Sequence, residues 1–112
     1  MATRVVIAED EAIIRLDLKE TLQEEGYDVV GETGRGDEAV RLVRELEPDL
    51  AILDINLGGE MVYDLVDALQ AQGVPVVFAT GYDPAAIPAR YASVPLCQKP
   101  IDPEQIARAI FG

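Results

Sequence analysis

Carboxylates, a hydroxyl and an ammonium group follow four apolar segments of the chain, each where the segment ends. Glu9 and Asp10 follow the first segment and Asp54 follows the third. Thr80 and Lys99 follow the fourth and the fifth. Three carboxylates make an all-oxygen site of the kind that Mg²⁺ prefers. A metal ion beside an aspartate is what phosphoryl transfer to that aspartate requires, and the threonine and lysine can contact phosphoryl oxygens.

Each of these residues also has an ordinary interpretation. An acidic pair at the end of a strand is usually solvated loop charge, and a single threonine or lysine is less informative still. Asp54 differs because it follows the apolar run LAIL directly, where a half-buried charge needs a partner. The prediction therefore depends on the four strand ends taken together.

Alternating strands and helices must position these residues. Prolines and Gly81 leave at most a turn or two of helix between residues 81 and 93. The alternation implies a parallel sheet with helices on both faces, and ligands bind beyond the carboxyl ends of such strands. Apolar runs predict strands over 4–8, 28–31, 50–53, 74–79 and 94–97, and helical spacing predicts helices over 11–25, 37–47, 60–72 and 102–111, the last with Asp102 as its N-cap.

The composition excludes several classes of function. The chain has 112 residues, enough for one domain, and 49% of them are apolar, which supports a folded core. A net charge of −12 repels nucleic acid and anionic lipid. The absence of histidine excludes Ser–His and Cys–His catalysis, and the single Cys97 fits a reducing, cytoplasmic compartment. No apolar run approaches the length of a membrane span.

The order of these residues along the chain resembles a known family. Glu9-Asp10, Asp54, Thr80 and Lys99-Pro100 are similar to the motif of the receiver domain of two-component response regulators, the CheY-like family. The resemblance covers essentially the whole chain, residues 1–112, as one receiver domain. It implies a flavodoxin-like α/β fold, with a doubly wound five-stranded parallel sheet in strand order 2-1-3-4-5 and a short or irregular fourth helix.

A narrower resemblance lies in residues 53–60, 78–82 and 98–100. These stretches are similar to the alphaproteobacterial FATGUY receivers, which are mostly stand-alone domains paired with histidine kinases of the HWE/HisKA2 type. Gly58 stands where most receivers have proline, and Leu96 stands where most have an aromatic switch residue. Tyr82 is the obvious substitute for that aromatic side chain.

The resemblance assigns roles to individual positions. Asp54 would accept the phosphoryl group, and Thr80 and Lys99 would sense it. The ligands of Mg²⁺ would be Glu9, Asp10, Asp54 and the backbone carbonyl of Asn56.

The implied function is regulatory, not enzymatic. A sensor histidine kinase or a histidine phosphotransfer protein would supply the phosphoryl group, and phosphorylation would change the surface around residues 80–96 for a downstream protein partner. Ile13 and Leu16 are predicted to face outward from the first helix, where a kinase would dock. No direct contact with nucleic acid or a membrane is expected.

Two alternatives stay open on the sequence. The chain could be the receiver part of a longer regulator or hybrid kinase whose output domain is absent. It could instead be an Mg²⁺-dependent aspartyl-phosphate phosphatase of the haloacid-dehalogenase type. In such phosphatases the nucleophile follows the first strand and a second acid comes two residues later, a pattern that Glu9-Asp10-Glu11 does not match.

Overall fold

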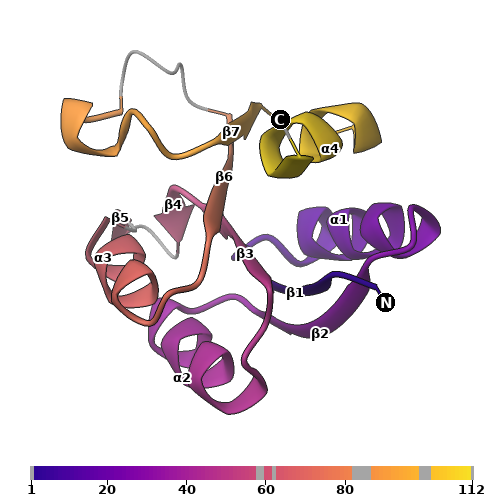
Figure 1. Ribbon diagram of the computed structural model, residues 1–112, viewed down its shortest axis with the longest axis horizontal. Coiled ribbons are helices and arrows are strands. Elements are labelled where there is room, and N and C mark those ends of the chain that lie inside the picture. Colours follow the sequence, from indigo (N-terminus) through magenta and orange to yellow (C-terminus); the bar gives the residue numbers. More distant parts are fainter. Residues whose placement is uncertain (1, 58–59, 62, 82–86, 99–101, 112) are drawn as a thin grey trace.

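The centre of the molecule is a five-stranded sheet in the order β2-β1-β3-β6-β7 (Figure 1). The computed structural model describes residues 2–57, 60–61, 63–81, 87–98 and 102–111. All four pairings in this sheet are parallel. The order confirms the predicted arrangement 2-1-3-4-5, counting the sheet strands along the chain. The strands are β1 Arg4–Ala8, β2 Asp28–Thr33, β3 Leu50–Asp54, β6 Val76–Thr80 and β7 Leu96–Gln98.

Helices cover both faces of the sheet (Figure 1). Helices α2 and α3 pack on one face through Ala39, Val43, Val66 and Leu69. Helices α1 and α4 pack on the other through Leu18, Leu22 and Ile106. The doubly wound α/β architecture is therefore confirmed. The helices are α1 Ala12–Glu24, α2 Gly36–Leu46, α3 Tyr63–Ala71 and α4 Pro103–Phe111.

The central strands are apolar along their whole length because both of their faces are covered. Every residue of β3 (LAILD) and β6 (VVFAT) is buried, and so are the last four residues of β1. Burial of each Val, Leu or Ile side chain contributes about 1.5–3 kcal/mol. These strands hold the last residues of β3 and β6, Asp54 and Thr80, at the carboxyl edge of the sheet while their side chains stay buried.

Two predicted helix ends have clear local causes. Gly26 has a φ of 92° just after α1, a left-handed conformation that glycine adopts without steric cost. At the start of α4, the backbone N–H of Gln105 donates to Asp102 Oδ1 at 2.9 Å. The prediction of Asp102 as the N-cap is therefore confirmed.

The prediction of a helix from residue 60 is wrong. Asn56–Leu57 (β4) and Glu60–Met61 (β5) pair as short antiparallel strands, and α3 begins only at Tyr63. Leu57 is buried in the core, so the hairpin contributes apolar contacts as well as satisfying backbone groups. Helical spacing continued back through residue 60 could not reveal this pairing, because Glu60 pairs with Leu57 and Met61 pairs with Asn56, upstream of the predicted helix.

The connection between β6 and β7 contains one turn of 3-10 helix, Ala89–Tyr91 (η2), in its described part. This agrees with the prediction of at most a turn or two of helix. The Tyr91 ring stacks on Tyr63 of α3 at a centroid distance of 4.7 Å, and Tyr63 packs edge-on against Phe78 of β6. The hydroxyl of Tyr91 donates to Asp67, and Arg90 pairs with the same carboxylate at 2.8 Å. Aromatic packing and a shared carboxylate therefore attach η2 to α3.

Candidate metal centre

Three carboxylates meet at the carboxyl edge of the sheet. Glu9 and Asp10 follow β1, and Asp54 is the last residue of β3, which pairs with β1. One carboxylate oxygen from each residue lies within 4.8 Å of the others. Glu9 is only 1% exposed and Asp54 only 7%, whereas Asp10 faces solvent. The structure thus brings together the three acidic side chains that the sequence places at these strand ends.

The chemistry of this donor set fits Mg²⁺. It offers carboxylate oxygens, and its open side at Asp10 leaves room for the waters that Mg²⁺ retains. Two like unit charges at 4.8 Å repel each other by roughly 3 kcal/mol at an effective dielectric constant of about 20. A divalent cation bound among the three acids would relieve this repulsion.

Thr80 shares this edge of the sheet. It ends β6, the strand next to β3, and its neighbour Ala79 is opposite Asp54 in the register. The Thr80 side chain is 1% exposed, so its hydroxyl lies inside the fold. Two other residues predicted for this edge, Lys99 and Tyr82, lie outside the described residues.

The remaining predicted residues occupy different surroundings. Asn56 lies two residues after Asp54, where β4 begins. Leu96 begins β7 opposite Phe78 and is half-buried. Ile13 and Leu16 on α1 are 82% and 53% exposed, so their predicted outward orientation is confirmed.

Hydrogen bonds hold the loop that carries Glu9 and Asp10, here called the acid loop (residues 9–11). The Glu9 N–H donates to the Thr33 carbonyl at 2.9 Å, and the Glu9 carbonyl accepts from Arg15 Nη1 at 2.7 Å. The Glu11 N–H donates to Glu9 Oε1 at 3.2 Å. Arg15 and Thr33 were not among the predicted site residues. The available signal was a basic residue in the first turn of α1, shortly after the acidic pair.

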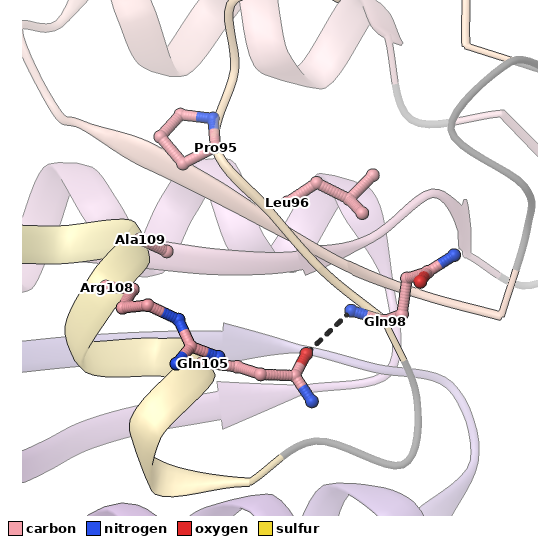
Figure 2. A pocket seen from close by; sticks show the side chains of 6 residues that line it. All are labelled: Pro95, Leu96, Gln98, Gln105, Arg108 and Ala109. Carbon is pink, nitrogen blue, oxygen red and sulfur yellow. Dashed lines mark hydrogen bonds between the residues drawn. The ribbon is translucent and has the colours of Figure 1, made fainter. Parts of the chain in front are cut away.

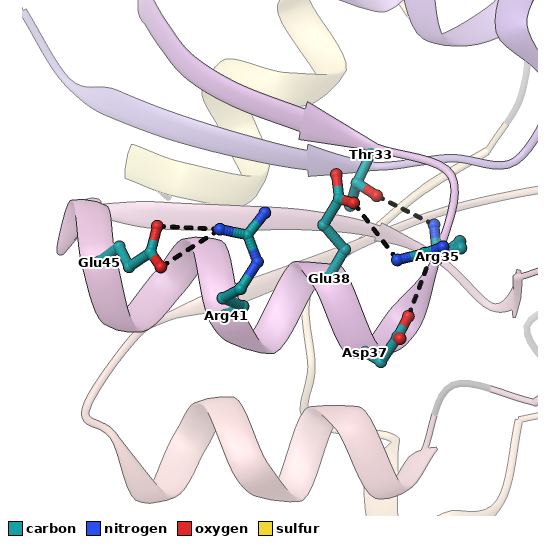
Figure 3. Close-up of polar contacts among 6 residues, drawn as sticks. All are labelled: Thr33, Arg35, Asp37, Glu38, Arg41 and Glu45. Atoms are coloured by element: carbon teal, nitrogen blue, oxygen red, sulfur yellow. Dashed lines mark hydrogen bonds and ion pairs between the residues drawn. The ribbon is translucent and has the colours of Figure 1, made fainter.

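The loop between β2 and α2 lies against the acid loop. The Thr33 hydroxyl accepts a hydrogen bond from the Arg35 backbone N–H at 3.1 Å, and Arg35 pairs with Asp37 and Glu38 (Figure 3). A side chain at Gly34 would place its Cβ 3.5 Å from the Asp10 Cα. This is an ordinary van der Waals distance, so the two loops lie in contact at this position.

A separate groove of about 500 Å³ lies between β7 and α4 (Figure 2). Inside it, the Gln98 N–H donates to Gln105 Oε1 at 3.1 Å, which satisfies a backbone donor of the outer strand. None of its lining residues belongs to the acid cluster. They are Pro95, Leu96, Gln98, Gln105, Arg108 and Ala109.

A doubly wound α/β sheet with acidic side chains converging at its carboxyl edge defines a class of protein, the flavodoxin-like domains that carry a polar site at that edge. Comparison with family models identifies the family. The model described as the response regulator receiver domain matches residues 5–111, and the chain belongs to this family. It is thus a receiver domain of two-component systems.

Relatives and solved structures agree with this assignment. The transcriptional regulatory protein PdtaR of Mycobacterium tuberculosis is 45% identical over 80 residues, which cover 70% of this chain and 39% of PdtaR. The solution structure of SdrG from Sphingomonas melonis Fr1 is 34% identical, with a TM-score of 0.85 over 98% of this chain and 94% of SdrG. The receiver domain of PhyR from Erythrobacter litoralis is 29% identical, with a TM-score of 0.84 over 98% of this chain and 91% of that structure. The chain spans less than half the length of the first relatives that it matches.

The family to which the chain belongs has a known general chemistry. Receiver domains are regulatory phosphoacceptors and not classical enzymes, and they bind Mg²⁺ at an acidic pocket. They receive phosphoryl groups from histidine kinases or phosphotransfer proteins and act on downstream partners. The phosphatase alternative is not favoured.

Among the described residues, no helix is both long and apolar enough to cross a membrane.

Proposed function

We propose that Asp54 is the phosphoacceptor of this receiver domain. The observation that carries the proposal is the position of Asp54, buried at the end of a central strand with the Glu9 and Asp10 carboxylates within 4.8 Å. An Asp54 carboxylate oxygen attacks the phosphorus atom of a phosphohistidine. The new oxygen–phosphorus bond forms as the phosphorus–nitrogen bond breaks, and the imidazole keeps the electron pair and takes a proton from solvent.

The other polar residues of the edge would prepare Asp54 for this step. Glu9, Asp10, Asp54 and the backbone carbonyl of Asn56 would hold Mg²⁺, which supplies positive charge for the phosphoryl oxygens. The Thr80 hydroxyl would donate a hydrogen bond to one phosphoryl oxygen, and Lys99 would neutralise another. The burial of Thr80 beside β3 and the convergence of the three acids support these roles.

Labelling with acetyl phosphate tests the assignment. The parent chain should gain one phosphoryl group by intact mass in the presence of Mg²⁺ and lose it when EDTA replaces the metal. Asp54→Asn, which keeps the shape of the side chain but removes the nucleophilic charge, should not be labelled. Asp28→Asn changes an exposed carboxylate at the start of β2 and should be labelled like the parent. Labelling of Asp54→Asn near the parent level would overturn the proposal.

We also propose that the domain belongs to the FATGUY group and acts in the cytoplasm with a kinase of the HWE/HisKA2 type. The run Phe78-Ala79-Thr80-Gly81-Tyr82 and the similarity to SdrG and PhyR support this proposal. PhyR of Bartonella quintana is an anti-anti-sigma factor and another PhyR is a stress response regulator, so the proposed downstream partner is a protein of stress signalling. Transfer from purified kinases of this type, compared with kinases of other types, tests the pairing.

A second arrangement is that this domain is the receiver part of a longer regulator or hybrid kinase. The observation that favours it is that the chain corresponds to 39% of the length of PdtaR. In either arrangement, a stand-alone protein or part of a longer one, we propose that residues 1–112 form one receiver domain. The length of the native reading frame decides between them.

Ile13 and Leu16 are proposed to contact the kinase. Single exposed apolar residues are common, but these two lie one turn apart on α1, directly after the acid loop. Ile13→Glu and Leu16→Glu should slow transfer from the kinase and leave acetyl phosphate labelling unchanged. Gln23→Glu, an exposed change at the far end of α1, should affect neither reaction. Equal loss of both reactions in the first two variants would contradict a docking role.

A further inference from the structure

Arg15 connects three parts of the molecule near the acid cluster. From α1, its Nη1 donates to the carbonyl oxygen of Glu9 at 2.7 Å, and its Nε lies 3.6 Å from Glu32 Oε1 at the end of β2. Its side chain is 22% exposed, so the guanidinium is largely enclosed. A Cβ at Gly34 would lie 3.1 Å from Nη1, which shows how closely the β2–α2 loop covers the guanidinium.

The bond from Arg15 completes the anchoring of the Glu9 backbone. The Glu9 N–H is held by the Thr33 carbonyl at 2.9 Å, and the Glu9 carbonyl is held by Arg15. The Glu9 carbonyl belongs to the peptide group that leads into Asp10, so its direction sets where the Asp10 side chain starts. A hydrogen bond with a charged donor is among the stronger ones in proteins, which suits this use.

Glu32 in turn orients Arg15. Its second carboxylate oxygen lies 3.1 Å from Lys19 Nζ, so Glu32 faces two cations of α1. Lys19 shares this carboxylate with Arg15, yet no contact joins it to the acid loop within the described residues. Lys19 therefore provides a matched control: a cation of the same helix, with the same partner and without the contact to the Glu9 carbonyl.

We propose that Arg15 is a positioning residue that holds the acid loop in the geometry in which Glu9, Asp10 and Asp54 converge on Mg²⁺. This inference rests on the proposed function, because it assigns Arg15 to the same metal site. Arg15 acts through its hydrogen bond to the Glu9 carbonyl and not through its charge.

The direction of the change in Mg²⁺ affinity distinguishes a role of the Arg15 hydrogen bond from a role of the Arg15 charge. Removing a positive charge near a cation site strengthens cation binding by electrostatics alone. Loss of the loop geometry weakens binding, and partners that orient metal ligands typically contribute about 10- to 100-fold in affinity. Arg15→Gln should therefore weaken Mg²⁺ binding about tenfold, whereas Lys19→Ala should leave it unchanged or slightly tighter.

Titration of each variant with Mg²⁺, followed by amide chemical shifts of residues 9–11, provides the test. Arg15→Lys keeps a cationic donor and should recover part of the lost affinity. In the metal-free protein, the Glu9 carbonyl carbon resonance should shift in Arg15→Gln and stay in place in Lys19→Ala.

The possible results of these titrations separate the role of Arg15 from the proposed function of Asp54. Equal or tighter Mg²⁺ binding by a folded Arg15→Gln, with a parent that binds Mg²⁺ and is labelled at Asp54, overturns the role of Arg15 and leaves the proposed function intact. An unchanged Glu9 carbonyl resonance in the metal-free variant overturns the role of Arg15 as well. A parent that binds no Mg²⁺ overturns the proposed function and the role of Arg15 together. If Arg15→Gln does not fold, Arg15→Lys decides, because it keeps the charge but not the bond geometry at the Glu9 carbonyl: Mg²⁺ binding weaker than in the parent supports the positioning role, and binding equal to that of the parent overturns it.

Discussion

Asp10 is the exposed member of the acid cluster, and its charge is the one that can be removed without disturbing the core. Asp10→Asn should raise the melting temperature of the metal-free protein, because it relieves repulsion from Glu9 and Asp54. Because Asp10 faces solvent, water screens much of this repulsion, and at low salt the gain should be about 1 kcal/mol, or roughly 4 °C. The same change should abolish most of the rise in melting temperature that Mg²⁺ produces in the parent.

Thermal melting at constant ionic strength measures both effects. Solutions with MgCl₂ are compared with NaCl solutions of equal ionic strength, so that general screening of the net charge cancels. Asp28→Asn, at the opposite edge of the sheet, serves as the control for loss of one negative charge. An equal Mg²⁺ response in Asp10→Asn and in the parent would show that the ion binds elsewhere.

The acid cluster could be predicted from the sequence because a simple rule governs it. Once parallel strands are identified, their carboxyl ends must share an edge, and Glu9, Asp10 and Asp54 follow from their places after two strands. Arg15 could not be predicted in the same way. Its partner is the backbone carbonyl of Glu9, and every residue has a backbone carbonyl. The types of the side chains therefore do not indicate this contact.

At the scale of the elements, Asp102 stabilises the start of α4. Hydrogen bonds from Gln105, first from its backbone N–H, lower the pKa of Asp102 below its usual value of 3.8. A lowered pKa contributes stability that is present above pH 3.8 and is lost as the pH falls through the lower folded-state value. The cap is therefore complete at neutral pH and lost in strong acid.

Asp102→Ala should lower the melting temperature at pH 7 and speed hydrogen exchange at the start of α4. The difference from the parent should shrink as the pH falls below 3.8, because the parent then loses its own cap. Asp102→Asn can still accept the bond from Gln105, so it should be milder at pH 7 and lack this pH dependence. A difference between Asp102→Ala and the parent that stays constant down to pH 2 would contradict the role of the carboxylate.

Tyr91 attaches η2 to α3 through its ring and its hydroxyl. Tyr91→Phe keeps the stack on Tyr63 but loses the bond to Asp67, so exchange of amides in residues 89–94 should become moderately faster. Tyr91→Ala loses the stack as well and should have a larger effect, with a lower melting temperature. Arg90→Gln removes an exposed ion pair with the same Asp67 and should change little. Exchange as fast in Arg90→Gln as in Tyr91→Ala would assign the attachment to charge instead.

The elements themselves were predictable to different degrees. Strand β1 and the cap of α4 match the prediction because an apolar run and an N-cap aspartate are local signals. The helix predicted over residues 60–72 begins at Tyr63, since Glu60 and Met61 pair with β4. Strands β6 and β7 begin two residues later than predicted, just after Pro75 and Pro95, which lack the backbone N–H of a ladder donor.

On the scale of the whole molecule, the sheet is the structure that joins the acid cluster to the segment after β6. Asp54 in β3 lies opposite Ala79 in β6, one residue before Thr80. From β6, Phe78 contacts Tyr63, which stacks on Tyr91 of η2. If Thr80 moves toward a phosphoryl group, as proposed, these ring contacts connect its strand to η2. Leu96 stands where most receivers have an aromatic switch residue. Its side chain has neither a ring nor a hydroxyl, so it cannot replace the rotation of that aromatic residue.

Beryllofluoride, which mimics a phosphoryl group on aspartate, tests whether this path carries the signal. With Mg²⁺ present, hydrogen-exchange protection within residues 80–93 should rise, and by more than in α1 or α4, because a hydrogen bond from Thr80 would restrain the segment that follows it. Asp54→Asn should show no response. Thr80→Val should still respond in the loops after Asp10 and Asp54 but not in residues 80–93. A parent response confined to those two loops would mean that the segment after β6 does not sense phosphorylation, and that the signal leaves the domain by another surface.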